Sequence, residues 1–317
     1  MAPQHNLLPD GRLHFSHGPI DLIIQADGRA DAVELAHQRA WRRFERVLAE
    51  LVSELGELRR PVGAANTLRG DVARRMWDAC HPFRHGYITP MAAVAGAVAQ
   101  EILACYAWPG IERAAVNNGG DIALLLGQGR SYRVGICADV ESATGGAIRG
   151  DLKPDGNIVI DAQMPVRGIA TSGWRGRSFS LGIADSVTVL ALTAAQADAA
   201  ATVIANAVNL DDARIARAPA CELKDDSDLG DLPVTVDVPR LEAGLVGQAL
   251  DAGLARARQL REAGLIWGAL LSCQGQAVQL LARAEESGSE CRRRLSFQYQ
   301  TSSVPPVIPF PTSRISL

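Results

Sequence analysis

Three short stretches of this chain combine residue types that could bind a charged ligand. In the first, Asn118, Gly119, Gly120 and Asp121 stand where one predicted strand should end or bend. Paired glycines permit positive φ and let a ligand approach the backbone, and exposed peptide amides in such a turn can hold anionic oxygens. A tight hairpin, with Asp121 as a local turn acceptor, is an equally good interpretation of the same residues.

The second stretch is Thr171, Ser172 and Gly173, at the end of another predicted strand. Two hydroxyls and a glycine in that position suit contacts with a phosphate or with the edge of a flavin ring. Tripeptides of this composition are common, so the stretch indicates little by itself.

The third stretch is a predicted helix over 194–208 that carries Asp198 and Thr202. Four residues apart, their side chains share one helical face. Mg²⁺ prefers oxygen ligands in octahedral geometry and often takes only one or two from side chains. A plain exposed polar pair on an amphipathic helix explains the spacing too, and without further context it is the favoured interpretation.

His81 and His85 flank a Pro-Phe-Arg segment in a predicted loop. Such a group could supply an acid–base residue and a phosphate contact, but the four-residue spacing does not place two ligands on one face outside a helix. The sequence contains no motif of a serine hydrolase, a zincin or a P-loop enzyme.

Composition limits the class of protein. With 47% hydrophobic and 21% charged residues, the chain is typical of a globular protein. A net charge of −3 gives no general attraction to nucleic acid or to an anionic membrane. No window approaches 18 apolar residues, the start lacks a signal-peptide pattern, and the six cysteines lack metal-site spacing. We therefore expect a cytoplasmic protein without nucleic-acid or membrane partners.

Periodicity predicts an α+β fold. Apolar residues recur at helical steps over 31–58, and a small-residue helix is expected over 91–107. Strands separated by uneven helices, rather than in strict βαβ alternation, favour an α+β arrangement over a doubly wound sheet. The small residues of 91–107 could pack against a second copy, giving a homodimer, or within the core, and the core is favoured.

The expected division of the chain is an N-terminal arm over 1–18, one domain over 19–284 and a tail over 285–317. The tail is rich in Pro and Ser, which predicts disorder.

Taken in order, these segments resemble the ApbE superfamily, the FAD:protein FMN transferases. VNNGGDI, GIATSG and ADSVTVLALTAAQADAAAT are similar to its aspartate turn, its threonine–serine–glycine element and its metal-binding helix. The resemblance covers about 89–208. It implies a mixed or antiparallel sheet packed with helices, FAD or FMN at Asn118–Asp121 and Thr171–Gly173, and Mg²⁺ at Asp198, Thr202 and a carbonyl near Val94.

The chain also departs from that family. The family has a histidine–isoleucine–isoleucine–aspartate–proline segment that carries the expected base, and this chain has WRGRSFSLGIA in its place. The lysine of the family's glycine-rich element is also replaced here, by Ala95. His85 and Asp185 are the candidates for the missing base. The alternatives are a Mg²⁺-dependent transferase with an acceptor protein, a non-catalytic flavin-binding or maturation protein, and another cofactor-metabolism enzyme on the same scaffold.

Overall fold

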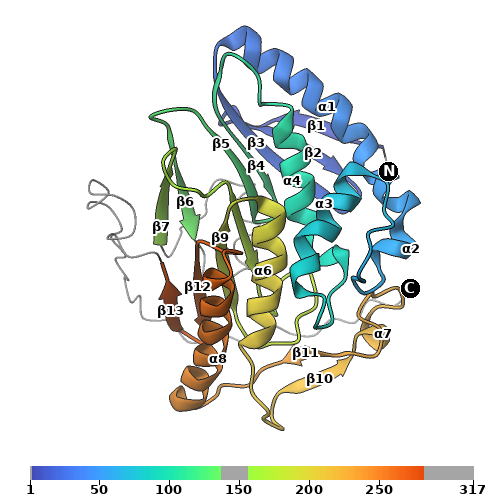
Figure 1. Ribbon diagram of the computed structural model, residues 1–317, viewed down its shortest axis with the longest axis vertical. Coiled ribbons are helices and arrows are strands. Elements are labelled where there is room, and N and C mark those ends of the chain that lie inside the picture. The colour runs from blue at the N-terminus through green and yellow to red at the C-terminus, as the bar shows by residue number, and fades with distance from the viewer. Residues whose placement is uncertain (1, 137–155, 282–317) are drawn as a thin grey trace.

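The computed structural model describes residues 2–136 and 156–281, and its main element is a nine-stranded antiparallel sheet (Figure 1). Helices pack against this sheet, so the predicted α+β class is confirmed. In their order across the sheet, the strands are β1 (Gln4–Leu7), β2 (Leu13–His17), β3 (Ile20–Gly28), β4 (Ile111–Asn118), β5 (Asp121–Leu126), β8 (Gly168–Ser172), β9 (Ser186–Ala191), β12 (Gly268–Cys273) and β13 (Gln276–Leu280).

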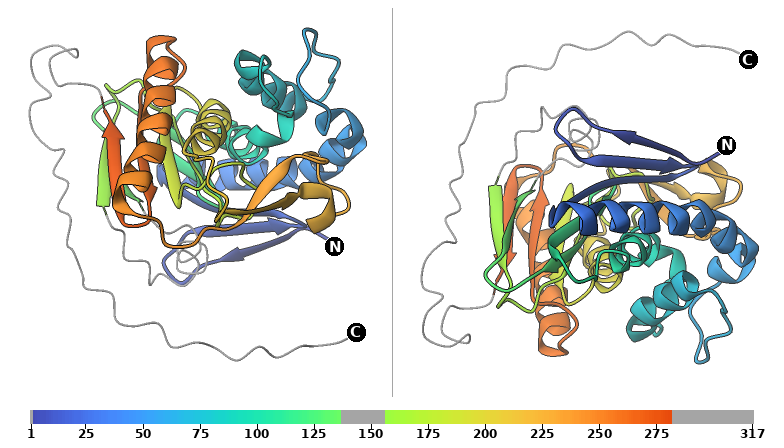
Figure 2. Two further views of the ribbon diagram at one scale, coloured as in Figure 1. Left: turned by 90° about the horizontal axis from the view of Figure 1, so that it is seen from below. Right: turned by 90° about the horizontal axis from the view of Figure 1, so that it is seen from above.

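The first residues belong to the sheet. The sequence predicts an arm over 1–18, whereas β1 and β2 extend the sheet from β3 and form one edge of it, opposite β13 (Figure 2). Phe15 lies opposite Leu22 in this register and packs against Phe44 with ring centroids 5.3 Å apart. One buried aromatic ring therefore anchors two short strands whose other residues are exposed or only partly buried. Strands this short and exposed give a weak signal in the sequence.

Helices cover one face of the sheet, with α4 and α6 over its central strands (Figure 1). The first helix shows why, since its buried residues recur every three or four positions and face the core. The helices are α1 (Ala30–Ser53), α2 (Leu55–Leu58), α3 (Asp71–Cys80), the 3₁₀ turns η1 (His81–Phe83) and η2 (Pro90–Ala93), α4 (Val94–Ala104), α6 (Ala194–Ala207), α7 (Ala220–Leu223) and α8 (Ala243–Glu262).

Small residues let α4 and α6 approach each other closely. A Cβ added at Gly96 would lie 2.3 Å from the carbonyl oxygen of Ala194, so only glycine fits there. Ala97 and Ala201 are fully buried in the main core. The small-residue segment is thus a central core helix, and its close packing fixes the amino end of α4 against α6.

The hairpin of β6 (Ser131–Ile136) and β7 (Gly156–Asp161) packs on part of the opposite face, against β5, β8 and β9. A second small sheet pairs β10 (Ala216–Pro219) with β11 (Pro233–Asp237). Side chains alternate between the two faces along each strand. Ala123 and Ala170 pack in the helix-side core, while Ile169 packs with the β6–β7 hairpin. This alternation decides which candidate residues face α4 and α6.

Two further expectations concern the end of the chain and the membrane. Apolar runs over 265–271 and 276–281, on either side of Gln274 and Gly275, predict a hairpin from the sequence. The structure confirms it, since β12 pairs with β13 and both turn residues have positive φ. The predicted tail over 285–317 lies outside the described residues. Within the described part of the chain, no helix is both long enough and apolar enough to cross a membrane.

Candidate functional site

The β4–β5 connection is a two-residue turn made by Gly119 and Gly120. Their φ angles are +64° and +116°, conformations that L side chains rarely adopt. Asn118 pairs with Asp121 across the turn, and the Asn117 Oδ1 accepts a hydrogen bond from the Gly120 amide at 2.8 Å. No atom lies within 4 Å of a Cβ placed at Gly120, so the turn is open on that side.

Asn118 and Asp121 are buried polar residues on the face that packs against the helices. The Asn118 amide Nδ2 donates to the carbonyl oxygen of Ala95 at 3.1 Å. The next residue along α4, Gly96, donates its backbone amide to Asp198 Oδ2 at 2.9 Å. Asn118 therefore ties the glycine turn to the start of α4, and α4 in turn holds the carboxylate that projects from α6.

The amino end of α4 is a favourable place for the Asp198 carboxylate, because the first peptide amides of a helix carry partial positive charge and lack intrahelical acceptors. Asp198 keeps some solvent exposure, although protein atoms surround its carboxyl group. The buried Cys80, at the end of α3, also lies within the field of this carboxylate. Three helices thus converge on Asp198.

The stretch that begins at Thr171 completes the ring of contacts. The Thr171 backbone amide donates to Asp121 Oδ1 at 3.1 Å. Its side chain lies on the opposite face of the sheet, where the Thr171 and Thr188 hydroxyl oxygens are 2.9 Å apart. By strand alternation Ser172 faces the helices. Gly173 is a close-approach position, since a Cβ there would be 2.3 Å from the carbonyl oxygen of Asp185.

Asp121 and Asp198 form a pair of acids that repel each other. Burial raises the pKa of Asp121 to about 7, and the hydrogen bond from Thr171 and the charge of Arg177 only partly oppose that rise. Burial and the nearby Asp121 charge raise the pKa of Asp198 well above its usual range, against the hydrogen bonds from Gly96 and Ala95. A carboxylate pair in low dielectric favours either a bound proton or a bound cation.

The surrounding donors fit a hard cation. The Thr202 hydroxyl lies one helical turn beyond Asp198 on the same face and is half-buried. It makes no hydrogen bond within the described residues, and Val94 stands at the first position of α4. No three His, Cys, Asp or Glu side chains of the described chain cluster as metal ligands. Two carboxylates, a hydroxyl and backbone carbonyls are the oxygen-only set that Mg²⁺ prefers.

The two predicted bases lie in different surroundings. His85 is exposed in the loop after η1, and its side chain makes no hydrogen bond within the described part of the chain. Asp185 precedes β9 and is half-buried. Its carboxylate accepts a hydrogen bond from the backbone amide of Gln274, in the β12–β13 turn.

Arg177 is a residue at this site that the sequence did not single out. It belongs to the segment 173–185 between β8 and β9, and its Nη2 atom would lie 2.0 Å from a Cβ placed at Gly119. Its charge is close enough to act on Asp121. The available signal was an arginine in the segment that replaces the family's histidine motif.

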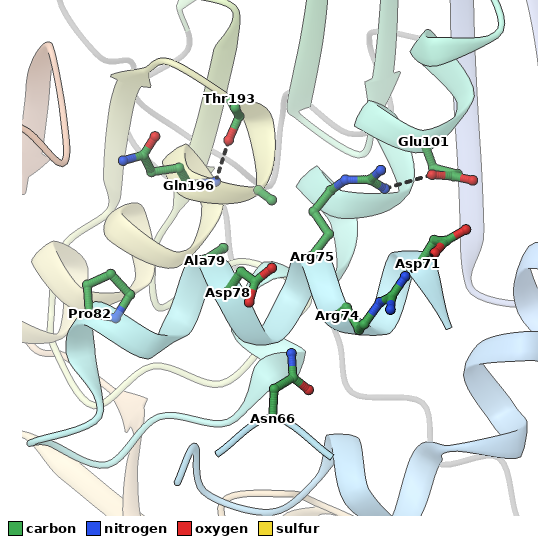
Figure 3. A pocket seen from close by; sticks show the side chains of 11 residues that line it. Asn66, Asp71, Arg74, Arg75, Asp78, Ala79, Pro82, Glu101, Thr193 and Gln196 are labelled. Carbon is green, nitrogen blue, oxygen red and sulfur yellow. Dashed lines mark hydrogen bonds and ion pairs between the residues drawn. The ribbon is translucent and has the colours of Figure 1, made fainter. Parts of the chain in front are cut away.

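A separate cavity of about 770 Å³ lies beside α3, and none of Asp121, Thr171, Asp198 or Thr202 lines it (Figure 3). Its charged lining is largely self-paired. Arg75 points toward Glu101, with Nη1 2.8 Å from Oε2, and Arg74 pairs with Asp71. The lining residues are Asn66, Asp71, Arg74, Arg75, Asp78, Ala79, Pro82, Glu101, Thr193, Ala195 and Gln196. We place the candidate site at the convergent acid pair because three chain segments meet there through hydrogen bonds.

Comparison with known proteins finds archaeal relatives. A UPF0280 protein of Methanothermobacter thermautotrophicus is 41% identical over 144 residues, which is 45% of this chain and 52% of the relative. One of Methanopyrus kandleri is 39% identical over 163 residues, 50% of this chain and 59% of the relative. The chain spans about half the length of the curated relatives that it matches.

A solved structure, the flavin transferase ApbE of Vibrio cholerae, aligns with 90% of this chain and 99% of its own. The two share 14% identity and a TM-score of 0.43, too low to transfer residue roles or function. The family assignment comes from a family model. The model described as "AbpE bacteria" matches residues 5–279 of the 317, which confirms the resemblance seen in the motifs, and the chain belongs to that family.

Proposed function

We propose that this chain binds a flavin nucleotide, FAD or FMN, together with Mg²⁺ where the glycine turn meets the starts of α4 and α6. The observation that carries the proposal is the convergence of Asp121 and Asp198. They lie 77 positions apart in sequence, and yet the charge of Asp121 is close enough to raise the pKa of Asp198. Membership of the family, together with the motif resemblance to FAD:protein FMN transferases, favours a flavin over other nucleotides.

In this proposal the cation is held by Asp198, with Thr202, Asp121 and a carbonyl near Val94 as further ligands. Bound there, Mg²⁺ would neutralise the two acids and the phosphates of the nucleotide. The chain's own residues orient these groups. The Gly96 amide fixes Asp198, and the Thr171 amide fixes Asp121. The open backbone at Gly120 lets the ligand approach the turn. Ser172 and Gly173 lie at the end of the neighbouring strand β8.

Binding without transfer is the function that the geometry supports best. Transfer of a nucleotide portion to an acceptor protein also needs a base to take the acceptor's proton. His85 is exposed and forms no hydrogen bond with the acid pair, and the Asp185 carboxylate is held by the β12–β13 turn. Transfer remains the second candidate, with those two residues as its proposed bases.

Flavin fluorescence titrations with and without Mg²⁺ test the proposal. We expect the wild-type protein to bind FAD or FMN, with an affinity that Mg²⁺ raises by about tenfold or more. Asp198→Ala should abolish the Mg²⁺ effect. Asp78→Ala is the matched control, because Asp78 is an exposed acid outside the site. Equal Mg²⁺ effects in the wild type and Asp198→Ala would remove the metal assignment.

A second assay separates binding from transfer. The protein is incubated with FAD, Mg²⁺ and candidate acceptor proteins that carry a threonine in an exposed segment. AMP release with covalently attached FMN would establish transfer. Bound flavin without AMP release would establish a binding protein.

A further inference from the structure

The segment 173–185 places a cation directly against the glycine turn. The Arg177 Nη2 would lie 2.0 Å, and its Cζ 3.2 Å, from a Cβ at Gly119, so the guanidinium occupies the space that any other residue's side chain would fill. Gly119 also has a φ of +64°, which disfavours other residues independently. The turn and the arginine are therefore matched in shape.

Arg177 forms no ion pair with an acidic side chain of the described chain. It is exposed and makes no hydrogen bond or ion pair within the described residues. Some arginines elsewhere in the described chain pair with acids. Arg43 donates to Glu50 and Glu101, and Arg214 donates to Asp212 and Glu242. Among the arginines without such partners, Arg177 lies against the glycine turn and beside the buried acid pair, so its N–H donors are available to a ligand at that place.

The acid pair does not need Arg177 as a structural partner. Asp121 already accepts from the Thr171 amide, and Asp198 accepts from the Gly96 amide. Arg177 acts on Asp121 only through space and forms no ion pair with it. The two carboxyl groups are buried, and the positive Arg177 lies exposed beside the glycine turn. A ligand group bound between a cation on the acids and this arginine would be an anion held from two sides.

Phosphate is the anion that this chemistry fits best. A guanidinium presents a planar fork of N–H donors that pairs two phosphate oxygens at once. Mg²⁺ binds phosphate oxygens readily and keeps few protein ligands. Building on the proposed function, we propose that Arg177 binds phosphate oxygens of the nucleotide, so that the site selects phosphorylated flavins over riboflavin.

The test measures affinity for riboflavin, FMN and FAD in the presence of Mg²⁺, using the full chain and its Arg177→Gln variant. Loss of one charge-assisted contact should weaken FMN and FAD binding by about tenfold or more. Riboflavin, which has no phosphate, should bind both proteins equally. Arg177→Lys should recover only part of the loss, because an ammonium cannot form the bidentate contact.

Arg175→Gln is the matched control, since Arg175 belongs to the same segment and stacks on the Trp174 ring at 4.9 Å. It removes the same charge and should change the affinity for FMN by less than about twofold. Thermal unfolding of each variant verifies that the fold is intact. Equal losses for FMN and riboflavin, or equal losses in the two arginine variants, would overturn the proposal.

Failure of the proposed function is distinguishable from failure of this inference. If the wild type binds none of the three flavins, the flavin assignment fails. Inorganic pyrophosphate with Mg²⁺, followed by calorimetry, then tests Arg177 alone. Pyrophosphate binding that Arg177→Gln removes would support phosphate recognition at the turn. No pyrophosphate binding in the wild type, or equal binding in both proteins, would overturn it.

Discussion

Two clusters of charged side chains involve α4, and they are built in opposite ways. On the helix itself, Glu101 accepts from Arg43 Nε at 2.6 Å and from Arg75 Nη1 at 2.8 Å. At the start of the helix, Asp198 meets backbone amides and the like charge of Asp121. Arginine side chains of the protein neutralise Glu101. Asp198 has no such partner among the described residues, so its charge is left for a bound cation or proton to neutralise.

The pKa directions express the same difference. Burial alone would raise the pKa of Glu101, but hydrogen bonds from Arg43 and Arg75 hold it below its usual range. Burial raises the pKa of Asp121 and Asp198, and amide donors do not offset it. A satisfied ion-pair network is typical of structure, whereas acids with raised pKa at a convergence of loops are typical of function.

Gly96→Ala is expected to have the largest effect on this comparison, because it displaces the start of α4 from α6. The new methyl would lie 2.3 Å from the Ala194 carbonyl oxygen, so the helices must separate. We expect a loss of about 3 kcal/mol in the free energy of unfolding, measured by urea denaturation. Gly247→Ala in α8, with nothing within 4 Å of its Cβ, should be neutral or stabilising. Equal stability of the two variants would contradict the close packing.

The pH dependence of stability separates the two clusters next. The pKa of Asp121 is about 7 in the folded protein, above its unfolded value, so the folded state binds more protons between about pH 4 and pH 7. Its contribution to stability is therefore lost as the pH rises through this window. The free energy of unfolding of Asp121→Asn, relative to that of the wild type, should therefore rise by about 2 kcal/mol from pH 5 to pH 8. A constant difference between the two proteins would show that Asp121 is ionised throughout.

Glu101→Gln should reveal the structural nature of the paired cluster. Removing this half-buried charge leaves Arg43 and Arg75 with a weaker acceptor, and we expect a loss of about 2 kcal/mol. Glu57→Gln is the control, because its ion pair with Arg60 is exposed and should contribute less than about 0.5 kcal/mol. Flavin and Mg²⁺ binding should be retained in both variants. Loss of flavin or Mg²⁺ binding in Glu101→Gln alone would show that the Glu101 cluster takes part in ligand binding.

Asp198→Asn should have the smallest effect on the free energy of unfolding, and it should stabilise the protein, whereas Glu101→Gln destabilises it. Its raised pKa means that the ionised carboxyl is less favourable in the folded protein than in water. The asparagine oxygen can still accept from Gly96. We expect a gain of about 1 kcal/mol at pH 8 without Mg²⁺, by the same urea method. A loss as large as that of Glu101→Gln would mean that the Asp198 charge is structural.

Local patterns predicted much of the fold. The helical repeat that includes Phe44 and Val47 placed α1, and the Gln274–Gly275 turn placed the last hairpin. Strand β2 was missed because Phe15 is its only fully buried residue. The convergence of Asp121 with Asp198 could not follow from spacing. It depends on sheet order and on the approach of α4 to α6, and only the motif resemblance anticipated it.

The candidate site shows a similar division. The turn glycines were recognisable because few residues adopt their φ angles. The orientation of Thr171 could have been predicted, since strand alternation puts it on the face opposite Ser172. Arg177 could not, because its position over Gly119 depends on the path of the segment between β8 and β9. Sequence therefore identified the residues of regular elements better than those that connecting segments bring in.

The central claim is that the unpaired acids, and not the cavity beside α3, bind the ligand. Crystals grown with Mn²⁺ and FMN, with anomalous differences measured at the manganese edge, test it most directly. We predict a peak about 2.1 Å from a carboxylate oxygen of Asp198, with ligand density beside Gly119 and Gly120. A metal and nucleotide bound between Arg74, Arg75 and Gln196, with nothing at Asp198, would contradict the account.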